Sequence, residues 1–130
     1  NQNLMVNGKD AIRTTRDTTG FTISNNTIAG NRQFGMEIYG SDNTVSDNCI
    51  QENNSGVSLV LPAAENRIFG NTFYANTAFN AKDTGGGNYW DDGAGTGNAW
   101  SDYSGEGEYN IRTDSTDHYP ETADGPCYTF

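Results

Sequence analysis

Three carboxylates in the last third of the chain stand among glycine and asparagine residues and could hold a metal ion. They are Asp91, Asp92 and Asp102. Hard oxygen donors on a flexible backbone suit Ca²⁺, which accepts roughly six to eight oxygen ligands. A solvated acidic surface has the same composition, and the spacing of an EF-hand loop is absent. We therefore expect either a Ca²⁺ site or a hydrated acidic surface.

Ligands for softer metals are scarce in the sequence. The chain has one histidine, His118, no Cys-X-X-Cys pair, and two methionines that are far apart. Zinc and copper sites need several nitrogen or sulfur donors close together. The sequence therefore does not predict a centre for either metal.

Two cysteines, Cys49 and Cys127, could form a disulfide. In the repeat described below, Cys49 falls in an outward-facing column with Thr27 and Thr72, while Cys127 lies in the tail. A bond between the two would hold the tail against the wall of the repeat, and an oxidising extracellular setting favours it. An intermolecular bridge and two free thiols remain open as alternatives.

Other side chains could bind or carry sugars. Exposed aromatic rings can stack on sugar rings, and no feature of the repeat directs Trp100 or Tyr103 inward, so these two are the candidate sugar-binding residues. Asn25 and Asn53 each begin an Asn-X-Ser/Thr pattern, which makes them candidate glycosylation sites. Asn53 also belongs to a column of the repeat whose amides should be engaged in hydrogen bonds.

A ten-residue pattern that occurs three times must position these side chains. Its copies are TISNNTIAGN at 22–31, TVSDNCIQEN at 44–53 and RIFGNTFYAN at 67–76. The predicted inward columns are Ile23, Val45, Ile68 and Trp90; Leu4, Ile28, Ile50 and Phe73; Ile12, Met36, Val57 and Phe79; and Thr14, Ile38, Leu59 and Ala81. The predicted asparagine columns are Asn7, Asn31, Asn53 and Asn76, and Asn26, Asn48 and Asn71. Trp90 is expected to cap the core at the end of its column.

Repeats of about 22 residues with three short strands each predict an all-β fold, a short right-handed parallel β-helix. We expect about four coils of roughly 22–24 residues over 1–92, paired at about 4.8 Å, and an irregular Gly/Asp-rich C-terminal cap and tail over 93–130. Asparagine suits the turns because it tolerates left-handed backbone angles and can bond to the same residue one coil up. A leucine-rich repeat would need several leucines per repeat, which this chain lacks.

The pattern resembles the right-handed parallel β-helix repeats of the NosD-like and carbohydrate-binding/sugar-hydrolase family. The resemblance covers roughly residues 4–105. Its most specific part is GNYWDD at 87–92 followed by GNAWSDY at 97–103, which is similar to the GNYWSDY segment that closes NosD-like helices. Family members usually continue with a DxDGDGIGD-type stretch, where this chain has SGEGE at 104–108. The resemblance implies a secreted or cell-surface β-helix, without the stretch that would carry a metal function.

A catalytic set is hard to find. Sugar-cleaving enzymes on this fold need paired carboxylates, or a carboxylate with arginine or lysine, facing one groove. The best outward column is Arg13, Glu37, Ser58 and Asn80. It offers a single carboxylate, and Arg13 beside Glu37 is more simply an ion pair between coils. We predict that the chain is not an enzyme.

The charge of the chain limits its partners. Seven Lys and Arg against seventeen Asp and Glu give a formal net charge of -10. This charge opposes binding to nucleic acids and anionic membranes. The sequence also has no apolar run near the roughly 18 residues of a membrane span. We expect no nucleic-acid partner, no membrane insertion, and a secreted, extracellular or cell-surface location.

The two ends of the predicted solenoid differ. Leu4 and Val6 already follow the repeat with no polar cap before them, and an uncovered end exposes apolar columns and unpaired backbone groups. Upstream residues, a cap that folds back from the tail, or a neighbouring copy could cover it. We favour a non-enzymatic, self-assembling surface or filament subunit built by stacking β-helix ends, with Ca²⁺ as a candidate bridging ion. The competing hypothesis is a secreted carbohydrate-binding module that takes glycans through Trp100 and Tyr103.

Overall fold

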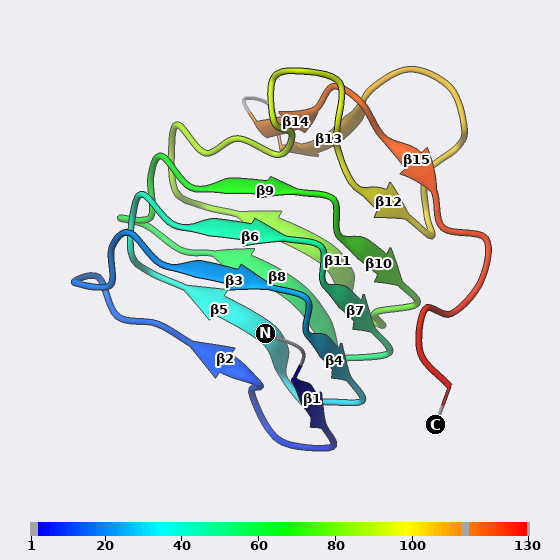
Figure 1. The fold of residues 1–130 in the computed structure, drawn as a ribbon, viewed down its shortest axis with the longest axis horizontal. Coiled ribbons are helices and arrows are strands. Elements are labelled where there is room, and N and C mark those ends of the chain that lie inside the picture. Colours follow the sequence, from blue (N-terminus) through cyan, green and yellow to red (C-terminus); the bar gives the residue numbers. More distant parts are fainter. Residues whose placement is uncertain (1–2, 113–114, 130) are drawn as a thin grey trace.

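The computed structural model describes residues 3–112 and 115–129, which form a parallel β-solenoid (Figure 1). Residues 1–2, 113–114 and 130, which fall within the predicted coils and tail, lie outside the described part. Every regular element in the described part is a strand, so the all-β prediction is confirmed. This part of the chain contains no helix long and apolar enough to cross a membrane.

Three parallel sheets run along the solenoid. Sheet A consists, in spatial order, of β1 (Leu4–Val6), β4 (Thr27–Ala29), β7 (Cys49–Gln51), β10 (Thr72–Tyr74), β12 (Ala99–Trp100) and β15 (Glu121–Thr122). Sheet B consists of β2 (Ile12–Arg13), β5 (Phe34–Ile38), β8 (Ser55–Leu59) and β11 (Phe79–Asp83). Sheet C consists of β3 (Thr22–Ser24), β6 (Thr44–Ser46) and β9 (Arg67–Phe69). Complete coils run from β3 to β5, β6 to β8 and β9 to β11, with β1–β2 before them and β12 after them.

The segment after the coils is more regular than predicted. β13 (Tyr109–Arg112) and β14 (Ser115–Asp117) form an antiparallel pair that lies against β11 at the C-terminal end of the stack (Figure 1). β15 then returns to sheet A and pairs in parallel with β12. β15 therefore extends sheet A, while Tyr109 of β13 stacks on Trp100 at the end of the core.

The predicted inward columns are confirmed in the middle of the stack. The column of Ile23, Val45 and Ile68 is in register across sheet C. In the first coil, however, Met5 pairs with Ile28, and Leu4 falls in the outward column with 56% of its surface exposed. The inward placement of Leu4 is therefore wrong, because Leu4, Met5 and Val6 are consecutive apolar residues and residue type alone does not distinguish the two faces.

A second register shift occurs in β11. Ala81 pairs with Val57 and Asp83 with Leu59, where the sequence alignment placed Phe79 and Ala81. The alignment followed apolar residue type, but β11 presents a carboxylate, Asp83, in the column that contains Ile38 and Leu59. The same shift places Lys82, and not Asn80, in the outward column of sheet B.

Asparagine ladders join the coils at the corners. In the predicted ladder of Asn26, Asn48 and Asn71, the Oδ1 atom of Asn48 accepts the backbone N–H of Asn26 at 3.0 Å and its side-chain amide at 3.2 Å. The predicted ladder of Asn31, Asn53 and Asn76 repeats this geometry. A third ladder, which the sequence analysis missed, consists of Asn43, Asn66 and Asn88.

Asn7 does not join the ladder that was predicted for it. The register of β1 against β4 places Asn7 beside Gly30, and both residues occupy left-handed corners, with φ angles of 60° and 68°. Asparagine tolerates this backbone conformation better than most residues. Asn7 therefore allows the left-handed turn at this corner and takes no part in the predicted ladder of Asn31, Asn53 and Asn76.

Candidate functional site

Two tryptophans close the C-terminal end of the core. Trp90 and Trp100 are fully buried, and Trp100 stacks on Phe73 and Tyr109 with ring-centroid distances of 4.4 and 4.0 Å. Trp90 thus lies in the capping position expected for it. The prediction that Trp100 offers an exposed ring to sugars is wrong, because β12 continues the core and buries the indole. Tyr103 is half-buried and packs against the same core.

The carboxylate of Asp117 terminates the ladder that contains Asn48. It accepts the backbone N–H of Asn98 at 2.7 Å and the indole N–H of Trp100 at 2.9 Å. Burial raises the pKa of Asp117, although these hydrogen bonds act in the opposite direction. An ionised carboxylate accepts hydrogen bonds and donates none, so the ladder stops at this residue.

Asp83 terminates the ladder that the sequence analysis missed. Its carboxylate accepts the side-chain amide of Asn88 at 3.1 Å, the indole N–H of Trp90 at 3.1 Å and the hydroxyl of Ser115 at 2.8 Å. A buried carboxylate is tolerated when donors surround it in this way. Asp83 therefore ties the core tryptophan to β14 of the cap.

The structure does not bring the three predicted calcium ligands together. Asp102 accepts the phenol hydroxyl of Tyr109 at 2.9 Å, Asp92 accepts backbone N–H groups of its own loop, and Asp91 binds His118. In residues 3–112 and 115–129, no group of three or more His, Cys, Asp and Glu side chains could hold a metal ion. A Ca²⁺ site shared by these three residues within one chain is therefore not supported.

Asp91 and His118 form a titratable pair at the surface of the cap. The His118 Nδ1 atom lies 2.7 Å from Asp91 Oδ2, and the His118 backbone N–H donates to the same oxygen at 2.9 Å. The hydrogen bond to Asp91 raises the pKa of His118. Burial acts to raise the pKa of Asp91, but the hydrogen bonds from His118 and Gly93 outweigh it and lower that pKa.

Donors for softer metals lie apart from one another. Both cysteines are in a disulfide, and the described chain has no free thiol. Met36 is fully buried in the core, and Met5 packs against the core near the opposite end from His118. His118 itself is bound to Asp91. These positions offer no cluster of nitrogen and sulfur ligands.

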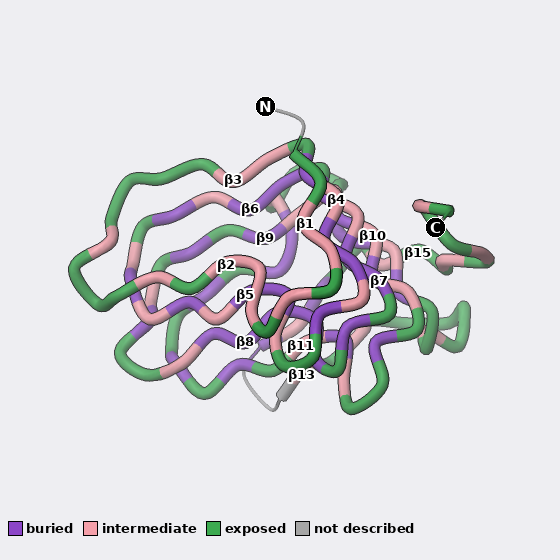
Figure 2. Tube along the Cα trace, turned by 90° about the horizontal axis from the view of Figure 1, so that it is seen from below, coloured by how far each residue is buried: buried purple, intermediate pink, exposed green. Residues whose placement is uncertain are grey.

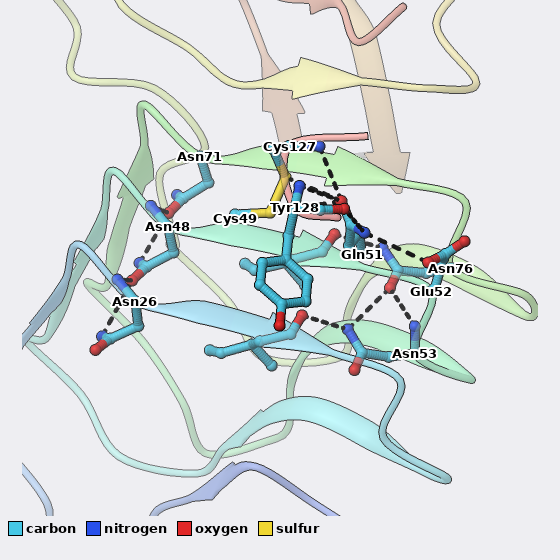
Figure 3. Close-up of a disulfide and its surroundings, with 12 residues drawn as sticks. Asn26, Asn48, Cys49, Gln51, Glu52, Asn53, Asn71, Asn76, Cys127 and Tyr128 are labelled. Carbon is cyan, nitrogen blue, oxygen red and sulfur yellow. Dashed lines mark hydrogen bonds between the residues drawn. A yellow bond between two sulfur atoms is a disulfide. The ribbon is translucent and has the colours of Figure 1, made fainter. Parts of the chain in front are cut away.

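The predicted intrachain disulfide between Cys49 and Cys127 is present and holds the tail on the outer face of sheet A (Figure 3). Gln51, a neighbour on β7, is fully buried and binds the tail backbone. Its Oε1 atom accepts the N–H groups of Cys127 and Tyr128 at 2.8 and 2.9 Å, and its Nε2 donates to the Tyr128 carbonyl at 2.7 Å. Sequence analysis missed Gln51, whose only signal was its place in the outward column two residues after Cys49.

The outward face of sheet B carries the predicted ion pair between coils. The Nε atom of Arg13 lies 3.2 Å from Glu37 Oε1, and the hydroxyl of Tyr39 donates to the other oxygen of Glu37 at 3.3 Å. Asn80, which was predicted on this face, instead accepts the Asn76 side-chain amide at 2.9 Å. The register shift in β11 turned it toward the ladder.

The strands β1, β2 and β3 form the N-terminal edge of the stack in the part of the chain that the structure describes. Within the described residues, β1, β2 and β3 each have a neighbouring strand on one side only. Met5, Ile12 and Ile23 on these three strands are partly buried, while their counterparts on β4, β5 and β6 are fully buried. Figure 2 shows the same difference between strands, since β3 is green and pink while β6 is partly purple. The apolar core therefore reaches this surface.

The two candidate glycosylation sites have opposite environments. Asn25 is exposed at a left-handed corner with a φ angle of 59°. Asn53 is fully buried, and its amide donates to the Ile28 carbonyl and to Asn76. The prediction for Asn53 is therefore wrong for the folded chain, and Asn25 stays a candidate.

The comparisons with known proteins give one match. Residues 1–105 match a family model described as "Periplasmic copper-binding protein (NosD)". Neither a curated protein nor a solved structure matches the chain. The matched segment covers the coils and β12, and it ends before β13.

Proposed function

The chain belongs to the NosD family, and from this we propose that it is a non-enzymatic structural protein outside the cytoplasm whose solenoid ends bind further copies of the chain. The family is described as periplasmic, and the disulfide suits an oxidising compartment. The outward face of sheet B supports the proposal that the chain is not an enzyme. Glu37, the carboxylate predicted there, already binds Arg13 and Tyr39.

Copper binding, which the family description names, does not enter this proposal. Copper favours imidazole, thiolate and thioether ligands gathered in one place. Here His118 is bound to Asp91, the cysteines are joined to each other, and Met36 is enclosed in the core. The donor set of the described chain therefore does not fit a copper ion.

The observation that carries the proposal is that sheet A has an unpaired edge at each end. Within the described residues, β1 pairs only with β4 and β15 pairs only with β12, in both cases in parallel. Leu4 and Glu121 lie in the same outward column of sheet A, which also contains Thr27, Thr72 and Ala99. β15 of one copy can therefore add to β1 of the next and continue the sheet without a change of direction. Such a contact is heterologous and builds an open filament.

The distribution of charge favours the same contact. Residues 1–34 contain four of the seven Lys and Arg but only two of the seventeen Asp and Glu. Residues 83–130 contain ten of the seventeen acids and one of the seven bases. Because β1 and β15 lie at opposite ends of the stack, a head-to-tail contact brings opposite charges together, whereas head-to-head stacking brings like charges together.

The net charge of -10 works against association at low ionic strength. At physiological ionic strength the screening length is about 8 Å, so contacts across the interface count for more than the repulsion between whole molecules. We therefore expect assembly near 0.15 M salt and dispersal at low salt.

A proline at the open edge tests the contact. Thr27 donates to the Asn3 carbonyl at 2.7 Å and Asn7 donates to Ala29 at 3.2 Å, so odd-numbered residues of β1 bond to β4. In a parallel ladder the alternate residues, including Val6, direct their backbone groups to the free edge. Val6→Pro therefore removes an edge donor without breaking the β1–β4 ladder.

Light scattering and electron microscopy should show concentration-dependent oligomers of the native chain and of the control Val6→Ala. The Val6→Pro variant should stay monomeric with a thermal unfolding curve close to that of the control. A native chain that stays monomeric at high concentration in 0.15 M salt would refute the proposal.

A further inference from the structure

The tail after β15 turns back along the outside of sheet A, toward the N-terminal end of the stack (Figure 1). It leaves β15 at Thr122 and reaches Cys49 on β7 through Cys127, five residues later. β15 and β7 are three strands apart in sheet A. With about 4.8 Å between strands this path measures about 14 Å, and five extended residues span at most about 16–18 Å. The tail is therefore just long enough to cross three strands.

The same reach has a second target in a head-to-tail filament. There, β15 of one copy is followed by β1, β4 and β7 of the next copy, so the neighbouring β7 is also three strands away. Cys49 lies in the outward column of Leu4 and Glu121, so it faces the same side of the continuous sheet. Cys127 can therefore reach Cys49 of its own chain or Cys49 of the neighbouring copy.

The path to the neighbouring copy follows a groove of about 440 Å³ on the outer face of β1 and β4. Its lining residues are Asn3, Leu4, Asn25, Thr27, Asp47 and Tyr128. Leu4 is 56% exposed there. On the other side of β7, the same column holds Thr72 and Ala99. A tail that crosses β1 and β4 therefore meets a larger apolar side chain than one that crosses β10 and β12.

We propose that copies in the filament exchange tails, so that Cys127 of one copy is bonded to Cys49 of the next. This inference rests on the proposed head-to-tail contact and adds a covalent link to it. The groove over β1 and β4 then holds the tail of the preceding copy, which covers Leu4.

The exchange needs a thiol as catalyst. Its thiolate attacks Cys127, which is exposed while Cys49 is half-buried, and the broken bond leaves Cys49 as a thiolate. Cys49 of the neighbouring copy, freed in the same way, then attacks the mixed disulfide on Cys127 and releases the catalyst thiolate. Each bond between copies replaces one bond within a copy, so the link forms without net oxidation or reduction.

An equal mixture of unlabelled and isotope-labelled native chain tests the proposal. The mixture is assembled at physiological salt with reduced and oxidised glutathione, blocked with N-ethylmaleimide, digested and analysed by mass spectrometry. A disulfide within a chain joins peptides of the same isotope, whereas a disulfide between copies also joins peptides of different isotopes. We expect mixed-isotope pairs of the Cys49 and Cys127 peptides, equal in amount to same-isotope pairs once exchange is complete. The linked filament should then resist dispersal at low salt until a reductant is added.

The Val6→Pro and Val6→Ala variants are the matched controls, since only the first blocks the contact. Val6→Pro should give same-isotope pairs alone, and Val6→Ala should behave as the native chain does. Assembly of the native chain with same-isotope pairs alone would overturn the exchange and leave the proposed function standing. Equal amounts of mixed pairs from the two variants would also overturn it, because exchange would then not need the contact. A native chain that stays monomeric would refute both the exchange and the proposed function.

Discussion

The asparagine ladders should be a main source of stability, and Asn48→Ala tests this at the centre of one ladder. Asn48 is 3% exposed. Its Oδ1 accepts both N–H groups of Asn26, at 3.0 and 3.2 Å, and its Nδ2 donates to Ile23 and Asn71, each at 2.9 Å. Alanine removes all of these bonds and supplies no replacement.

The cost follows from the groups that lose their partner. The backbone and side-chain donors of Asn26 lose the acceptor that Asn48 provides, and each buried polar group left unsatisfied costs about 1–3 kcal/mol. We expect the free energy of unfolding to fall by about 3–5 kcal/mol and the melting temperature by roughly 10–20 °C. Asn48→Asp should cost more, because a carboxylate oxygen would then face the oxygens of Ile23 and Asn71.

Thermal and urea unfolding followed by circular dichroism would measure these changes. Asn54→Ala is the matched control, because Asn54 is exposed and accepts a hydrogen bond from the neighbouring Ser55 hydroxyl at 3.2 Å. That control should change stability by about 0.5 kcal/mol or less. Equal losses for Asn48→Ala and Asn54→Ala would refute the view that the ladder stabilises the stack.

Three further predictions concern the core, the tail and the cap. Ile50→Asp should unfold the chain, because it places an unpaired charge in the fully buried column, while Thr72→Asp on the outward face should do little; equal melting temperatures would contradict this. Reduction of the disulfide should lower the free energy of unfolding by about 2–4 kcal/mol and release the tail while the coils persist. An unchanged melting temperature after reduction would contradict a stabilising role of the disulfide. The pair of Asp91 and His118 should stabilise the chain most between about pH 4 and pH 6.5. The pKa of His118 is raised in the folded chain, so its contribution to stability is lost as the pH rises through that pKa. The pKa of Asp91 is lowered, so its contribution is lost as the pH falls through that pKa. His118→Gln should lower the melting temperature within this range and remove the loss of stability that the pair shows above about pH 6.5, and an unaltered pH profile would contradict the assignment.

The repeat could be predicted from sequence because local periodicity determines it. Apolar residues that recur every 22 or 23 positions must face one core, and asparagines at the same spacing must meet at the corners. The missed ladder of Asn43, Asn66 and Asn88 obeyed the same spacing. It was overlooked because these residues stand outside the ten-residue pattern from which the columns were read.

The cap could not be predicted in the same way. Trp100 is buried because β15 and β13 return to cover it, and these contacts join residues that no repeat aligns. The sequence pattern made no prediction for Asp83, because its donors, Trp90 and Ser115, come from segments that the repeat does not align with it. Single-copy contacts of this kind leave no periodic signal in one sequence.

Cross-linking between copies is the most direct test of head-to-tail assembly. Leu4 and Glu121 are both exposed and share one outward column, and the described chain has no free thiol to compete with an introduced cysteine. A short bis-maleimide added to a mixture of the Leu4→Cys and Glu121→Cys variants should yield a mixed dimer, while either variant alone should yield none. Cross-linked dimers from the Leu4→Cys variant alone, or no mixed dimer at concentrations where the native chain would assemble, would contradict the account.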